Sequence, residues 1–149
     1  YRHAPLARKG MLQPQQMLDF ARRMIDAFRI TTPSPHTRVK FLSGGNLQKT
    51  ILAREITACG GLLVAVHPTR GLDVGATEAV RKLLLQERAR GMAILLISED
   101  LEELLALSDR IAVLFEGQVM GVVPGAQADA EKLGLMMAGA GRLDAGSAA

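Results

Sequence analysis

The stretch that decides the fold is Leu42-Ser43-Gly44-Gly45-Asn46-Leu47-Gln48-Lys49. A hydroxyl residue and two glycines stand here directly before a helical pattern that closes near Cys59-Gly60-Gly61. The start of a helix carries unpaired N–H groups and a partial positive charge, and glycine lets a phosphate approach the backbone closely. The stretch therefore predicts an anion site, while a flexible loop with a helix cap explains the same residues equally simply.

Composition describes an ordinary globular chain. Of 149 residues, 48% are hydrophobic and 22% are charged, which fits one domain or a piece of one. With no Trp and a single Tyr, the chain has little material for stacking on nucleic-acid bases. The single cysteine, Cys59, excludes an intrachain disulfide framework and fits a reducing compartment.

The N-terminal residues and the apolar runs bear on location. No apolar run approaches the roughly 18 residues that a membrane span requires. The first residues, Tyr1-Arg2-His3-Ala4-Pro5, lack the apolar segment of a signal peptide and contain no initiator Met. We therefore expect Tyr1 to mark the boundary of a fragment.

Charge is distributed unevenly along the chain. Residues 1–50 carry 9 basic and 2 acidic groups, whereas residues 101–149 carry 3 and 7. A basic first third is compatible with nucleic acid or an anionic membrane surface. Its charges are scattered over a loop, a helix and another loop, however, which favours a solvated face.

Before the deciding stretch, one helix is predicted. Apolar residues at helical spacing indicate a helix from Pro14 to about Phe28. The two prolines of 31–35 then forbid a continued helix or a central strand. Residues 1–12 are predicted to be irregular, and residues 39–42 to be short and extended.

After the deciding stretch, apolar runs alternate with helical patterns. Residues 62–66 and 93–97 are continuously apolar, which is typical of strands buried on both faces. The other expected elements are a helix over 76–89 with Val80, Leu83 and Leu84 inward and Gly91 as its stop, a short helix capped by Ser98, a hairpin of 110–115 and 118–123 through Glu116-Gly117, a helix over 127–137, and a disordered tail from Gly139.

Alternating buried strands and helices predict an α/β fold with a mostly parallel sheet flanked by helices. In such sheets ligands bind beyond the carboxyl ends of the strands. The residues that fall at those ends are His67, Arg70, Asp73, Ser98 and Glu99.

Four motifs occur in order: Leu42-Ser43-Gly44-Gly45, Pro68-Thr69-Arg70-Gly71-Leu72-Asp73, Leu96-Ile97-Ser98 and Leu107-Ser108-Asp109-Arg110-Ile111. Their order and spacing resemble the C-terminal half of an ATP-binding cassette (ABC) ATPase domain, over about residues 12–123. More narrowly, the chain is similar to the second cassette of the tandem ATP-binding subunits of bacterial sugar and nucleoside importers. The resemblance implies a P-loop NTPase-like fold.

The resemblance also implies how the chain is divided. Residues 1–41 match part of the helical subdomain and its connecting loop, and residues 42–138 match the signature helix and the C-terminal part of the ATPase core. Residues 139–149 form the expected tail. The family's phosphate loop and glutamine-bearing loop have no counterpart in these residues, and both are expected upstream of Tyr1.

In the family, two cassettes dimerise head to tail, and each ATP lies between the phosphate loop of one and the signature of the other. The matching signature residues are Leu42, Ser43, Gly44, Gly45, Asn46 and Gln48. Of these, Ser43 and Gly45 match the positions that contact the γ-phosphate across the interface. Gly71, Leu72 and Asp73 match the D-loop at the dimer seam.

The resemblance implies ATP and Mg²⁺ as cofactors of the full-length protein, with neither expected on this fragment alone. The implied partners are the other cassette of the same subunit, a membrane permease and, indirectly, a periplasmic or lipoprotein solute-binding protein, without nucleic acid. The implied location is peripheral, at the cytoplasmic face of the inner membrane.

Three positions depart from the family's pattern. Val66 replaces the aspartate that organises Mg²⁺, His67 replaces the glutamate that polarises the attacking water, and Glu99 replaces the switch histidine. Losing a positioned general base costs about 10²–10⁴ in rate. The cassette's own site is therefore expected to be dead or very slow, while its signature serves the partner's site.

Other interpretations of these side chains remain open. His67 is also able to act as a base near neutral pH, and Ser98, His67 and Asp73 form a conceivable hydrolytic triad, although no Gly-x-Ser-x-Gly elbow is present. A metal is not expected, because His3, His36 and His67 show no ligand spacing.

Two other functions compete with import. The chain is also compatible with a non-transport ABC protein acting on nucleic acid or ribosomes, for which the basic first third is the only support. The other rival is a catalytically inert cassette that merely scaffolds a dimer.

Overall fold

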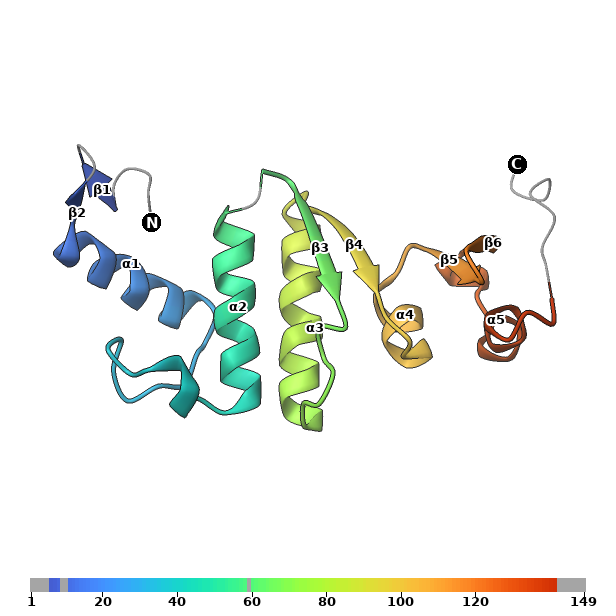
Figure 1. The fold of residues 1–149 in the computed structure, drawn as a ribbon, viewed down its shortest axis with the longest axis horizontal. Coiled ribbons are helices and arrows are strands. Elements are labelled where there is room, and N and C mark those ends of the chain that lie inside the picture. Colours follow the sequence, from blue (N-terminus) through green and yellow to red (C-terminus); the bar gives the residue numbers. More distant parts are fainter. Residues whose placement is uncertain (1–5, 9–10, 59, 142–149) are drawn as a thin grey trace. The chain divides into compact units, whose positions relative to one another are not determined.

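The computed structural model describes residues 6–8, 11–58 and 60–141. Helices and strands alternate along most of the chain, as predicted (Figure 1). The elements are β1 Ala7–Arg8, β2 Met11–Leu12, α1 Pro14–Ala27, α2 Gly44–Ala58, β3 Leu62–Val66, α3 Val74–Ala89, β4 Ala93–Ile97, α4 Leu101–Leu107, β5 Arg110–Phe115, β6 Gln118–Pro124 and α5 Ala130–Met137, with one-turn 3₁₀ helices at Val39–Phe41 and Gly125–Gln127.

The chain divides into two compact units. The first comprises Tyr1–Leu63 and Pro68–Leu95, and the second comprises Val64–His67 and Leu96–Ala149. The neighbouring strands β3 and β4 contribute to both. They run parallel: the N–H of Ala93 donates to the carbonyl of Gly61 at 2.9 Å, and that of His67 donates to Ile97 at 2.8 Å. The predicted parallel pair is confirmed.

In the first unit, α2 and α3 pack against each other. Val80 and Leu84 of α3 are buried, as predicted, whereas Leu83 is only half-buried. The helix begins at Val74 rather than Ala76, because the carboxylate of Asp73 caps it. It ends as predicted before Gly91, whose φ of +93° favours glycine.

The second unit is built on the predicted hairpin of β5 and β6. Its turn residues, Glu116 and Gly117, both have positive φ, +45° and +77°. The antiparallel register shifts between Val113 and Leu114. The hairpin and α5 share one apolar core, which consists of Ile111, Val113, Met120, Val123, Leu133 and Met136.

Two segments before α2 differ from the prediction. Within residues 1–12, predicted to be irregular, β1 and β2 form an antiparallel pair with Ala7 opposite Leu12. Two-residue strands are too short to show a period in the sequence. Residues 39–41, predicted to be extended, form a 3₁₀ turn in which the N–H of Phe41 donates to the carbonyl of Arg38 at 3.0 Å.

The strands are not buried on both faces, contrary to the prediction. In β3, Leu63 is 5% exposed and Ala65 is 6% exposed, whereas Val64 and Val66 are more than half exposed. In β4, Leu95 and Ile97 are exposed as well. The described residues cover only one face of each strand, and an apolar run does not reveal which of its faces has a partner.

Two helix starts in the second unit also differ. Asp100, not Ser98, caps α4: its Oδ1 accepts hydrogen bonds from the N–H groups of Glu102 and Glu103. The last helix, α5, begins at Ala130 rather than at residue 127, because Asp129 caps it. Of the predicted disordered tail, residues 142–149 lie outside the described residues, as do Cys59 and His3.

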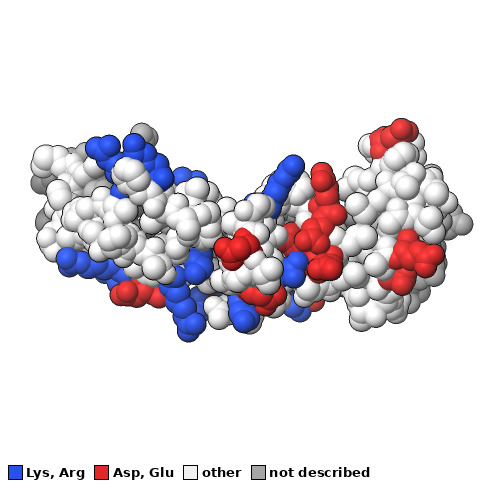
Figure 2. Space-filling view, turned by 90° about the horizontal axis from the view of Figure 1, so that it is seen from below, with Lys and Arg blue, Asp and Glu red and all other residues white. Residues whose placement is uncertain are grey.

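Basic side chains do not form one continuous patch on the face shown in Figure 2. Lys and Arg lie in several separate places there, with uncharged and acidic residues between them. This arrangement supports the interpretation of the basic first third as a solvated face. Within the described part of the chain, no helix combines the length and apolar character needed to cross a membrane.

Candidate functional site

The signature stretch forms the first turns of α2. Gly44 and Gly45 were predicted to precede the helix, but they are its first two residues. Ser43 stands immediately before them, exposed, and its carbonyl accepts a hydrogen bond from the N–H of Leu47 at 2.8 Å. The N–H groups of the first turn have no carbonyl partner within the helix, so they and the Ser43 hydroxyl are available to an anion.

Gly45 is required by helix packing as well as by its place in the signature. A Cβ added there would lie 2.6 Å from the Cβ of Ala76 in α3, closer than real Cβ contacts allow. A Cβ added at Gly44 would meet only the Leu72 side chain, at an ordinary 3.6 Å. The two glycines therefore differ: the second allows α2 to approach α3.

The predicted D-loop lies against the start of the signature helix. Gly71 adopts a φ of +75°, and Leu72 is the neighbour of Gly44. The Oδ1 of Asp73 accepts a hydrogen bond from the N–H of Ala76 at 2.8 Å. Asp73 and Gly45 thus meet at Ala76, a residue that sequence reasoning missed because its only local signal is its place three residues after a cap.

Asn46 makes two side-chain hydrogen bonds. Its Oδ1 accepts from the N–H of Thr31 at 2.8 Å, and its Nδ2 donates to the Oγ of Ser43 at 3.0 Å. One turn later, the Nζ of Lys49 donates to the carbonyl of Arg29 at 3.1 Å. The sequence did not predict the contacts of Arg29 and Thr31, because these residues contribute backbone atoms, which every residue type has.

The three positions that are expected to depart from the family's pattern lie in the second unit. Val66 ends β3 and is 56% exposed. His67 follows it, half-buried, with a φ of +45°, and is tied to β4 through its N–H. Glu99 is exposed beyond the end of β4. Among the described residues, no three His, Cys, Asp or Glu side chains are grouped so as to hold a metal ion.

Comparison with solved structures identifies the class of this fold. The chain aligns with the ATP-binding cassette MJ1267 of an ABC transporter with a TM-score of 0.72 and 19% identity, over 89% of this chain and 53% of that one. It aligns with the cassette MJ0796, in a dimeric structure with ADP and phosphate, with a TM-score of 0.65 and 19% identity, over 78% and 50%. The fold is that of an ABC ATPase cassette, within the P-loop NTPase class.

The sequence relatives of this chain are import ATP-binding proteins. The chain is 45% identical to the guanosine import ATP-binding protein NupO of Bacillus subtilis, over 99% of this chain and 29% of the relative. It is 37% identical to the ribose import ATP-binding protein RbsA of the same species, over 84% and 25%. The chain is thus a homologue, over most of its length, of sugar and nucleoside import ATP-binding proteins. It spans less than a third of the length of these relatives. No protein-family model matches it.

Proposed function

We propose that this chain is the signature-bearing part of a cassette that completes an ATP site held by a partner cassette. The parent subunit would couple ATP binding and hydrolysis to the import of a sugar or nucleoside. The proposal rests on one observation: the first turn of α2, which directly follows Ser43, lies against the predicted D-loop, with Gly44 next to Leu72 and with Gly45 and Asp73 meeting at Ala76. Two motifs separated in sequence thus form one surface.

This surface suits a phosphate. The Ser43 hydroxyl and the N–H groups at the start of α2 would bind the γ-phosphate of ATP, which supplies the phosphoryl group for transfer when it is bound. The solved MJ0796 cassette is dimeric and binds ADP and phosphate, which supports a site shared between cassettes. The described residues offer no ligand cluster for Mg²⁺, so we assign no step to the metal here.

The cassette's own site is proposed to be degenerate. The side chain of Val66 has no oxygen to organise a metal, and Glu99 places a carboxyl group where the family has histidine. His67 has a φ of +45°, and its N–H donates to the carbonyl of Ile97, so its backbone is held against β4. The chain would then contribute to catalysis only through its signature.

The import names of the relatives support the proposed partners. The subunit would act with the other cassette and a membrane permease, and indirectly with a solute-binding protein, at the cytoplasmic face of the membrane. The helix α1 would belong to the segment facing the permease. Segment 1–41 as helical subdomain and 42–138 as ATPase core remain predictions.

Two substitutions in the full-length transporter test whether this chain contributes to catalysis through its signature and not through its own site. Ser43→Arg should lower ATPase activity in membrane vesicles about tenfold or more, since losing one charge-assisted contact costs about 1.5–3 kcal/mol. His67→Gln should change it little, because the ring has no role in the partner's site. The reverse ranking would overturn the proposal.

A further inference from the structure

Helix α1 has no buried residue, and two backbone hydrogen bonds define where it ends. The N–H of Arg29 donates to the carbonyl of Asp26 at 3.2 Å, and that of Ile30 donates to Ile25 at 2.9 Å. Arg29 itself has a φ of +49°. This is a Schellman motif with arginine at the position that usually holds glycine. It aims the backbone of residues 29–31 toward α2.

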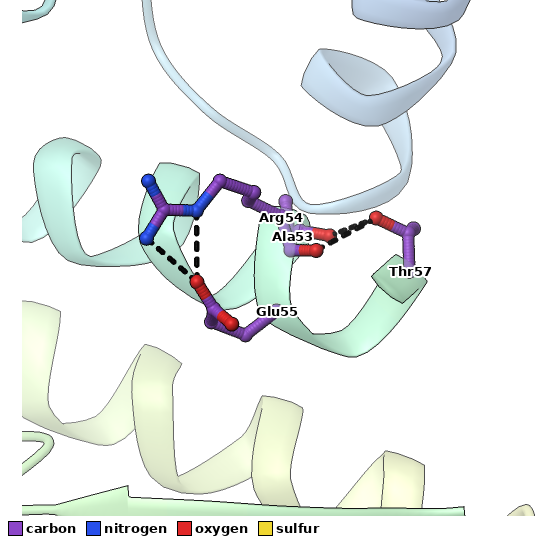
Figure 3. Close-up of polar contacts among 4 residues, drawn as sticks. All are labelled: Ala53, Arg54, Glu55 and Thr57. Atoms are coloured by element: carbon purple, nitrogen blue, oxygen red, sulfur yellow. Dashed lines mark hydrogen bonds and ion pairs between the residues drawn. The ribbon is translucent and has the colours of Figure 1, made fainter. Parts of the chain in front are cut away.

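Side-chain packing between α1 and α2 is incomplete. A cavity of about 630 Å³ separates them, lined by apolar residues of both helices that include Met24, Ile25 and Ala53. Polar side chains that line the cavity form hydrogen bonds within their own segment. The hydroxyl of Thr57, for example, donates to the carbonyls of Ala53 and Arg54 in the same helix (Figure 3). Besides the buried side chains of Phe28 and Ile30, polar contacts near the start of α2 join the end of α1 to that helix.

Asn46 and Lys49 supply those contacts. They stand three residues apart on α2 and so share one face of the helix. Asn46 Oδ1 accepts from Thr31 N–H, and Lys49 Nζ donates to the Arg29 carbonyl. A backbone N–H only donates, so the amide oxygen of Asn46 must face Thr31 and its nitrogen must face Ser43.

We infer that Asn46 is a positioning residue that fixes the Ser43 hydroxyl and joins it to the end of α1, with Lys49 as the second tie. Asn46 Nδ2 donates to Ser43 Oγ, which occupies an acceptor site of the hydroxyl and leaves its hydrogen to donate outward. A movement of residues 29–31 would thereby reach the serine directly. This inference rests on the proposed function, because it assigns the outward hydrogen bond of Ser43 to a phosphate oxygen of ATP.

The experiment combines amide hydrogen exchange at Thr31 with ATPase kinetics in the full-length transporter. Asn46→Ala should speed exchange of the Thr31 N–H and lower kcat/KM for ATP, each about two- to tenfold, as expected for the loss of one neutral hydrogen bond. Asn46→Asp keeps the acceptor for Thr31 but removes the donor to Ser43. It should leave Thr31 protected and still lower kcat/KM. Lys49→Met should speed exchange at residues 29–31.

Thr57→Val is the matched control. It removes side-chain hydrogen bonds at the other end of α2 (Figure 3) and leaves the hydrogen bonds of Arg29, Thr31 and Ser43 in place. Equal Thr31 exchange in Asn46→Ala and Thr57→Val would overturn the inference, and so would faster exchange with unchanged kcat/KM. Unchanged exchange in α3 verifies that each variant folds.

If the proposed function is wrong, these experiments give a different set of results. In that case Ser43→Arg would leave ATPase activity unchanged, while the exchange at Thr31 would still report whether the tie exists.

Discussion

Gly45 and Asn46 are neighbours in the signature stretch, but the structure gives them different roles. Gly45 is small because Ala76 occupies the space where its Cβ would lie. Asn46 turns its amide back toward Ser43 and Thr31. The sequence placed both residues in a phosphate site, and the structure adds a packing requirement for one and a tie between segments for the other.

The packing requirement predicts different stabilities for two similar substitutions. Gly45→Ala should lower the free energy of unfolding by about 1–3 kcal/mol, because the added methyl group overpacks the contact with Ala76. Gly44→Ala should be neutral or slightly stabilising, since alanine favours a helix and has room there. Denaturant unfolding of the two variants measures the difference, and equal stabilities would contradict the close approach of α2 to α3.

Among the elements, the hairpin of β5 and β6 was predicted most closely. Its dipeptide Glu116-Gly117 marked the turn, and both residues have positive φ. Helix starts were less predictable: α3, α4 and α5 each begin after an aspartate cap, at Asp73, Asp100 and Asp129. Where several polar residues precede a helix, the backbone decides which one caps it.

A substitution in the hairpin turn is expected to stabilise the protein. Glu116 has a φ of +45°, a conformation that asparagine tolerates better. Glu116→Asn should raise the free energy of unfolding by about 0.5–1 kcal/mol. Glu116→Gln, which also removes the charge but has no such backbone preference, is the control. Thermal unfolding should show a higher midpoint for Glu116→Asn than for Glu116→Gln, and the opposite order would argue against the left-handed turn.

For the whole molecule, the residues of interest are distributed over both units. Ser43, Gly45 and Asp73 belong to the first, whereas Val66, His67 and Glu99 belong to the second. The chain also contains no Gly-x-x-x-x-Gly-Lys-Ser/Thr stretch to cradle the phosphates of a nucleotide. Its surface for ATP is thus proposed to be one side of a site whose other side another cassette supplies.

The chain of 149 residues should therefore not bind ATP tightly by itself. Its signature supplies a few hydrogen bonds to one phosphate, too few to hold a nucleotide in water. Calorimetric titration of ATP into this chain should give no measurable saturation at micromolar concentration. Micromolar binding would show that the chain holds a complete site, contrary to the proposed sharing between cassettes.

The sequence by itself determined the order of the α-helices and strands from α1 to α5, the parallel pair of strands, the hairpin and the Ser-Gly-Gly stretch at the start of α2. These features depend on periodicity and turn chemistry, which are local. Only the tertiary structure decided that Gly45 faces Ala76, that Asn46 reaches Thr31, and that one face of β3 is open. Such contacts join residues 15 or more positions apart or depend on which surfaces find a partner, and no local pattern records either.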